Sequence, residues 1–121
     1  MNLSDDALRE IIGRYKWFHS MELRPGVASS GPKTPEILAA EAPAFLGPLD
    51  LSGRSVLDVG AWNGFFSFEA SRRGAARVLA TDSFTWRYPA FRGRETLELA
   101  AAELGLPVET LELDPPDLDK V

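Results

Sequence analysis

The stretch VLDVGAWNGFFSF, residues 56–68, decides the fold expected for this chain of 121 residues. It opens with a short apolar run that is typical of a buried strand and stops at Gly60, and a helical pattern follows from about Asn63. Gly60 permits a sharp turn and lets a ligand lie against bare backbone, while Gly64 lets the helix begin close to that ligand. The free N–H groups of the first helical turn offer hydrogen-bond donors. The sequence therefore predicts a ligand site between a strand and a helix.

The remainder of the second half alternates between strand and helix patterns. This order is typical of a parallel α/β sheet with right-handed crossovers, and it amounts to half of a doubly wound sheet. The expected strands cover residues 55–59, 77–81 and 108–113, the expected helices cover residues 63–73 and 95–104, and residues 83–92 are expected to be irregular.

The first 50 residues are expected to form a helical extension. Residues 4–20 show an amphipathic helical pattern, and residues 22–33, rich in glycine, proline and serine, are expected to be a loop. A second helix is expected after the cap residue Thr34, and Pro43, Gly47 and Pro48 are expected to end it. The residues expected on its buried side are Ile37, Leu38 and Ala42.

Two acidic residues indicate which ligand the turn binds. Asp82 follows the second strand, where a carboxylate accepts hydrogen bonds from both hydroxyls of a ribose; the alternative is that Asp82 only caps the segment after the strand. Asp58, two residues before Gly60, suits a cationic ligand, or else bonds a neighbouring loop. A dinucleotide fingerprint has glycine where Trp62 stands, and an indole there would obstruct a pyrophosphate. These residues favour S-adenosylmethionine, a sulfonium without phosphates, over NAD.

Composition excludes several other classes of site. There are 13 Lys and Arg against 18 Asp and Glu, and the net charge of −5 argues against a basic nucleic-acid surface on this stretch. The chain has no cysteine and one histidine, so disulfides, thiolate sites and multi-histidine metal sites are excluded, and no metal is expected. The acidic start does not resemble a signal peptide, and no apolar run reaches the roughly 20 residues of a membrane span. We therefore expect a cytoplasmic protein without a membrane partner.

Residues 56–68, followed by RVLATDSFTW at residues 77–86, resemble motifs I and II of the class I S-adenosylmethionine-dependent methyltransferases. The upstream run WFHSMELRPGV, residues 17–27, is similar to the segment that precedes motif I in the tRNA wobble-uridine (mo5U34) branch. The resemblance implies a Rossmann-like methyltransferase fold, with residues 1–50 as an N-terminal extension or lid and residues 51–121 as the cofactor-binding half. The acceptor that it implies is a tRNA or a small molecule, left undecided.

The resemblance also assigns residues to parts of the cofactor S-adenosylmethionine. Around its methionine end it places the turn residues Asp58, Gly60, Ala61, Trp62 and Gly64. On its nucleoside it places Asp82 at the ribose, Ser83 and Phe84 beside the adenine, and Asp114 at the adenine amino group. No catalytic residue is assigned, because a sulfonium is already activated and methyl transfer needs mainly positioning. The alternative function is a non-catalytic nucleoside-binding module or an inactive fragment.

The family's fourth strand has no counterpart before Val121, so the chain is expected to be part of a longer protein or to self-associate through the free edge of its third strand. An apolar patch beside that edge is expected to consist of Leu97, Leu99, Ala100, Leu104, Val108, Leu111 and Leu113.

Three upstream residues have two interpretations each. His19 is either a general base or a solvated or hydrogen-bonded residue at a helix end. Trp17 either covers the cofactor or belongs to the core. Arg24 either pairs with a ligand carboxylate or is an ordinary surface arginine.

Overall fold

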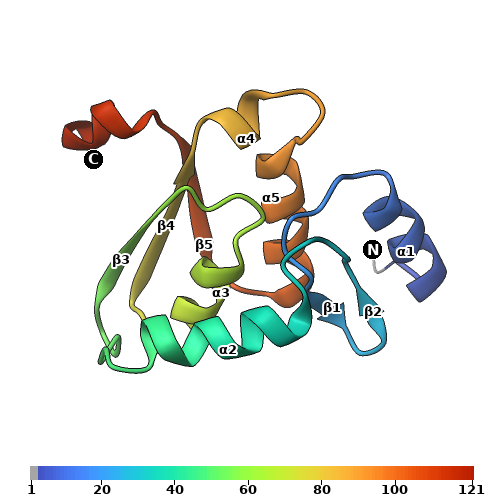
Figure 1. The fold of residues 1–121 in the computed structure, drawn as a ribbon, viewed down its shortest axis with the longest axis horizontal. Helices are drawn as coiled ribbons and strands as arrows, with labels where there is room; N and C mark the ends of the chain where they lie inside the picture. Colours follow the sequence, from blue (N-terminus) through green and yellow to red (C-terminus); the bar gives the residue numbers. More distant parts are fainter. Residues whose placement is uncertain (1–2) are drawn as a thin grey trace.

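A computed structural model describes residues 3–121, and a parallel sheet of three strands lies at its centre (Figure 1). The strands are β3 (Ser55–Val59), β4 (Arg77–Asp82) and β5 (Val108–Glu112), in the order β3-β4-β5. All three run parallel, in register. The predicted α/β class is confirmed, and β3 has the predicted bounds.

Helix α3 (Phe65–Arg72) connects β3 to β4, and α5 (Gly93–Leu104) connects β4 to β5. Right-handed crossovers that advance in one direction place both helices on the same face of the sheet, as Figure 1 shows. Gly105 closes α5 in the left-handed conformation that a helix end favours, with φ 68°. The segment expected to be irregular contains one short helix, α4 (Phe84–Arg87).

The core lies between these helices and the sheet. Leu97 and Ala100 of α5 are fully buried, so the apolar patch predicted on this helix is wrong. They pack in one cluster with Phe68 and with residues of the N-terminal segment, which the sequence analysis did not place there. On the opposite face of the sheet, Leu57 and Leu111 are exposed.

The N-terminal segment differs from the prediction. Helix α1 (Asp5–Gly13) ends seven residues before the predicted helix does, and a hairpin of β1 (Glu22–Arg24) and β2 (Val27–Ala28) replaces the predicted loop. After α1 the Trp17 ring packs into the core instead of continuing the helix. Trp17 is 5% exposed, and its Nε1 donates to the Ile12 carbonyl oxygen at 2.9 Å. Trp17 is therefore a core residue.

Helix α2 (Pro35–Leu46) begins where the sequence predicts, because the Thr34 hydroxyl accepts a hydrogen bond from the Ile37 N–H at 3.2 Å. Its packing differs from the prediction in two ways. Ile37 is 42% exposed and therefore not on the buried side. Pro43 lies inside the helix, since its fixed φ is compatible with helical backbone and only one N–H is lost near the end.

The last element is a 3-10 helix, η1 (Pro115–Lys120), which follows β5. Within residues 3–121, none of the helices combines the length and the apolar composition that crossing a membrane would require.

Candidate functional site

The glycine turn, residues 60–64, leads from the carboxyl end of β3 into α3 and lies against the carboxyl end of β4. The N–H groups of Gly60 and Ala61 both donate to the Thr81 carbonyl oxygen at 2.9 Å, which holds the turn against β4. Gly60 has φ 77°, and no atom lies within 4 Å of the place where a Cβ would be. The backbone of Gly60 thus presents an open surface, which a side chain would fill.

Asp82 lies beside this open backbone and is 8% exposed. Its two carboxylate oxygens accept hydrogen bonds from the N–H of Trp62 at 2.9 Å and from the N–H of Ser83 at 2.7 Å. The carboxylate is therefore fixed by backbone on both sides. Each oxygen keeps a further lone pair, so two hydroxyl donors can still be accepted.

A cavity of about 180 Å³ opens in front of Asp82, and a second cavity of about 360 Å³ adjoins it and shares Ser83 and Phe84 in its wall. Phe84 is 63% exposed and stacks on Tyr88 with ring centroids 5.4 Å apart. The predicted site residues that line these cavities are Gly60, Asp82, Ser83, Phe84 and Asp114.

Asp114 has an ion-pair partner that the sequence analysis did not identify. The Nη1 of Arg87 donates to both Asp114 oxygens, at 2.9 and 3.1 Å, and its Nε donates to Glu112 at 2.8 Å. Arg87 extends from α4 across the larger cavity's wall to the end of β5. The sequence signal for this ion pair was Arg87, a basic residue about one helical turn after the end of β4.

Asp58 lies behind the turn, on the face of the sheet that the helices cover. Its Oδ2 accepts a hydrogen bond from the Ser67 hydroxyl of α3 at 2.6 Å. Burial raises the pKa of the Asp58 carboxyl, and the neighbouring charge of Asp82 raises this pKa further against the lowering effect of the Ser67 hydrogen bond. Asp58 is thus bonded to a neighbouring element and does not line either cavity.

Trp62 and Gly64 face the protein interior, away from the cavities. Trp62 has the left-handed φ of 48°, and its ring stacks on Phe18 with centroids 4.5 Å apart. Gly64 has φ 92°, and a Cβ there would come within 2.8 Å of the Leu97 side chain. Gly64 therefore allows α5 to pack against the turn.

Asn63 joins the glycine turn to the N-terminal segment, and sequence reasoning missed it. Its Oδ1 accepts from the N–H groups of Phe18 at 2.8 Å and His19 at 3.1 Å, and its Nδ2 donates to the Thr96 hydroxyl at 2.6 Å. The side chain is fully buried. The signal available in the sequence was a polar residue, Asn63, directly after the bulky Trp62 of the turn.

His19 is buried and hydrogen-bonded. Its Nδ1 accepts the Phe65 N–H at 3.4 Å, at the first residue of α3. Burial lowers the pKa of His19 to about 4, the charge of Lys33 lowers it further, and Glu41 opposes this. At neutral pH the ring is uncharged and its Nδ1 already has a donor, which favours the hydrogen-bonded interpretation over the general base.

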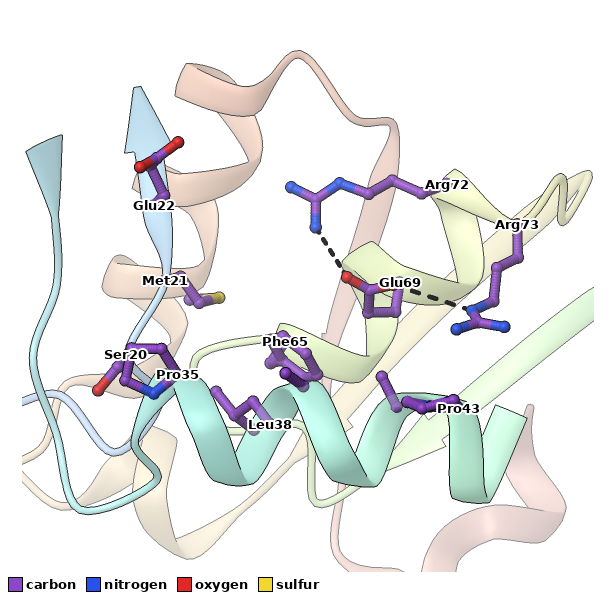
Figure 2. A pocket seen from close by; sticks show the side chains of 12 residues that line it. Ser20, Met21, Glu22, Pro35, Leu38, Pro43, Phe65, Glu69, Arg72 and Arg73 are labelled. Carbon is purple, nitrogen blue, oxygen red and sulfur yellow. Dashed lines mark hydrogen bonds and ion pairs between the residues drawn. The ribbon is translucent and has the colours of Figure 1, made fainter. Parts of the chain in front are cut away.

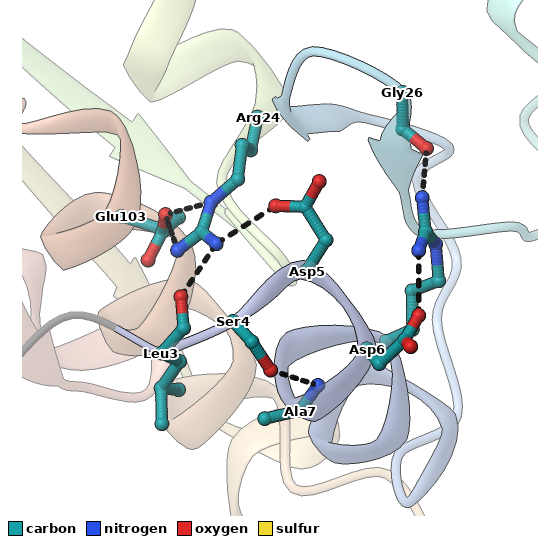
Figure 3. Close-up of polar contacts among 9 residues, drawn as sticks. Leu3, Ser4, Asp5, Asp6, Ala7, Arg24, Gly26 and Glu103 are labelled. Carbon is teal, nitrogen blue, oxygen red and sulfur yellow. Dashed lines mark hydrogen bonds and ion pairs between the residues drawn. The ribbon is translucent and has the colours of Figure 1, made fainter.

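Arg24 of β1 links the start of the N-terminal segment to α5 (Figure 3). Its Nε donates to Glu103 at 2.8 Å, and its Nη1 donates to the Leu3 carbonyl oxygen at 2.7 Å and to Asp5 at 3.0 Å. The guanidinium therefore has its hydrogen-bond partners within the chain, and it does not line either cavity at the strand tips.

A larger groove, of about 540 Å³, lies elsewhere, between α2, α3 and the start of β1 (Figure 2). Its floor includes Leu38 and Phe65, and its rim carries Glu69 with Arg72 paired to it at 3.2 Å. None of the strand-tip residues lines this groove.

Comparison with known proteins relates this geometry to methyltransferases. No protein-family model matches the chain. The ribosomal protein L11 methyltransferase of Deinococcus radiodurans is 41% identical over 64 residues, which are 52% of this chain and 22% of that protein. An S-adenosylmethionine-dependent methyltransferase of Mesorhizobium loti is 25% identical with a TM-score of 0.50, over 69% of this chain and 35% of its own.

A second solved structure shows the same fold over almost the whole chain. Phosphoethanolamine N-methyltransferase 1 of Haemonchus contortus, in complex with phosphoethanolamine and S-adenosylhomocysteine, has a TM-score of 0.56 at 19% identity, covering 93% of this chain and 22% of its own. The chain thus has the Rossmann-like methyltransferase fold, and it spans well under half the length of each of these three proteins.

Proposed function

We propose that this chain binds S-adenosylmethionine at the tips of β3 and β4 and serves methyl transfer from it. One observation carries the proposal: the fixed carboxylate of Asp82 lies beside the open backbone of Gly60, and both line one cavity at the strand tips. In open α/β sheets, ligands bind outside the carboxyl ends of the strands. The residues present fit such a cofactor.

Each part of the site has a distinct task in this proposal. The two free lone pairs of Asp82 accept the ribose hydroxyls, and the exposed ring of Phe84 stacks against the adenine. Asp58 and Asp82 supply the negative surroundings that a sulfonium prefers. S-adenosylmethionine supplies a methyl group that is already activated, so the remaining task of the protein is to hold donor and acceptor in line.

In this proposal Asp114 accepts a hydrogen bond from the adenine amino group and keeps its ion pair with Arg87. Because Arg87 holds both Asp114 oxygens, it fixes the carboxylate at the wall of the larger cavity. An oxygen in such a pair retains acceptor capacity for one more donor. Arg87 therefore acts as a positioning residue for Asp114.

Calorimetric titration with S-adenosylhomocysteine and, separately, with NAD tests the proposal. We expect S-adenosylhomocysteine to bind and NAD not to bind. Asp82→Asn should weaken S-adenosylhomocysteine binding by about 1–3 kcal/mol, the cost of mispairing buried hydrogen-bond groups. The matched control is Asp119→Asn, which makes the same change at an exposed position and should leave the affinity unchanged. Tighter binding of NAD, or an unaffected Asp82→Asn variant, would contradict the proposal.

For the acceptor, the resemblance of residues 17–27 to the wobble-uridine branch supports a tRNA. Phe18, from this run, stacks on the Trp62 ring, so the run packs against the interior side of the turn whose other side faces the proposed site. The net charge of −5 favours a small molecule instead. Titration with a tRNA anticodon stem-loop separates the two: binding that weakens steeply with salt identifies an RNA acceptor, and no binding at low salt favours a small molecule.

A further inference from the structure

Within residues 3–121, two residues other than glycine have a left-handed backbone, Trp62 with φ 48° and Arg92 with φ 47°. A residue with a side chain is strained at these φ values and keeps them only where its surroundings hold it. Trp62 lies in the glycine turn, and Arg92 is the cap residue at the start of α5. The contacts of these two residues therefore show what keeps each turn in its strained conformation.

One aromatic ring of the N-terminal segment lies against each of the two residues. The Phe18 ring stacks on the Trp62 indole, with centroids 4.5 Å apart and planes inclined by 12°. The Cζ of Arg92 lies over the Tyr15 ring, 5.0 Å from its centroid, and the Tyr15 hydroxyl donates to Glu95 at 3.1 Å. The segment thus contacts both strained residues through side chains that are three positions apart.

The contact with Trp62 leads to the proposed cofactor site. The N–H of Trp62 donates to the Asp82 carboxylate at 2.9 Å, and its carbonyl oxygen accepts from the Trp86 indole at 2.9 Å. The Trp62 indole contacts two rings, that of Phe18 and that of Phe91, whose centroid is 5.3 Å away. Relaxation of Trp62 to negative φ would rotate the peptide plane that carries its N–H. The hydrogen bond to Asp82 therefore depends on the left-handed conformation.

We propose that Phe18 is a positioning residue for the cofactor, a role that rests on the proposed function. Its ring holds Trp62 in the left-handed conformation, and the Trp62 N–H in turn fixes one oxygen of the Asp82 carboxylate for a ribose hydroxyl. The Phe18 backbone is anchored separately. Its N–H donates to Asn63 at 2.8 Å, and its carbonyl oxygen accepts from the Lys33 N–H at 3.0 Å. The ring can therefore be removed while the segment stays in place.

Amide hydrogen exchange of the ligand-free chain tests this role, because Trp62 and Ser83 donate to the two oxygens of the same carboxylate. In Phe18→Ala, exchange of the Trp62 amide should accelerate about tenfold while that of the Ser83 amide stays unchanged. Phe18→Tyr keeps the ring and should keep the slow exchange. The matched control is Tyr15→Ala, which removes the other ring and should leave the Trp62 amide unchanged. Equal acceleration at Trp62 and Ser83, or none at Trp62, would overturn the proposal.

Calorimetric titration with S-adenosylhomocysteine measures the same effect at the site. Phe18→Ala should weaken binding about tenfold, the scale of one hydrogen bond to a charged group. Glycine adopts the left-handed conformation without strain, so Trp62→Gly needs no ring to hold it. In the Trp62→Gly background, Phe18→Ala should therefore change the affinity less than about twofold. A loss as large as in the unmodified background would overturn the proposal. If S-adenosylhomocysteine does not bind the unmodified chain, the proposed function fails, and the exchange of the Trp62 amide still decides the role of Phe18.

Discussion

The glycine turn and the N-terminal segment that covers it are held by different kinds of contact. Residues 60–64 are held mainly by backbone hydrogen bonds to the neighbouring strand tip, over about 20 residues of chain. The N-terminal segment is held by side chains that span far greater separations, such as the 45 residues between Phe18 and Asn63 and the 79 residues between Arg24 and Glu103. The turn therefore depends on the next strand along the chain, whereas its cover depends on a few polar side chains that are far apart in the sequence.

Replacing Asn63, which links the turn to its cover, should give the largest loss in the free energy of unfolding. Asn63→Ala leaves two backbone N–H groups and one hydroxyl without their buried partner, and we expect the free energy of unfolding to fall by about 3–5 kcal/mol. Thr96→Val, which removes only the hydroxyl that Asn63 contacts, should cost less. Urea denaturation of both variants measures the order, and an Asn63→Ala loss below that of Thr96→Val would contradict it.

Acid should weaken the cover through His19. Its pKa is about 4 in the folded chain and about 6.5 when unfolded, so its contribution to stability is complete above pH 6.5 and is lost as the pH falls toward 4. The loss should reach up to about 3 kcal/mol over this range. Urea denaturation from pH 7 to 4 measures it against His19→Gln. A variant whose stability falls as steeply as that of the unmodified chain would assign the pH dependence to other groups.

Asp58 lets the turn be tested alone. Because the pKa of Asp58 is raised in the folded chain, its stabilising contribution is present below the ordinary aspartate pKa and is lost as the pH rises through the folded value. Asp58→Asn removes this cost at pH 7, because the amide has no charge to bury, and should raise the free energy of unfolding. It should also weaken S-adenosylmethionine binding, because the Asp58 charge is proposed to favour the sulfonium of that cofactor. Thermal unfolding and calorimetry together measure the two opposite effects, and a less stable variant would contradict the first.

Arg24 should give the smallest change in global stability, because its ion pairs lie near the surface and such pairs contribute little. The local effect is sharper: in Arg24→Ala, amide hydrogen exchange of α1 should accelerate while that of β4 stays unchanged. Arg24→Lys keeps the charge but loses the paired donation to Glu103, and it should show the same pattern more weakly. Equal acceleration in α1 and β4 would show that Arg24 stabilises the whole chain.

Sequence patterns located the features that depend on neighbouring residues. The bounds of β3, the cap at Thr34 and the left-handed Gly105 follow from local rules, and all are present. The predicted helix over residues 4–20 is too long because Trp17 and Phe18, which continue its apolar period, pack against other elements instead. No local pattern shows where such a side chain finds its partner.

The same limit applies to the site. Spacing from the glycine turn indicated Asp82, and the family resemblance indicated Ser83 and Phe84; all three line one cavity wall. Neither could indicate that Arg87 reaches Asp114, 27 residues on, or that the Trp62 ring turns inward onto Phe18. These contacts depend on how the sheet brings distant segments together, which a single sequence does not display.

The position of Trp62 also makes the protein its own optical sensor. Of its three tryptophans, Trp17 and Trp86 are 5% and 6% exposed, whereas the indole of Trp62 is only partly buried and stacks on Phe18. The N–H of the same residue donates to Asp82, so any ligand that engages this carboxylate acts on the residue that carries the fluorophore. Changes in emission on titration therefore report on the strand tips directly, and no dye has to be attached.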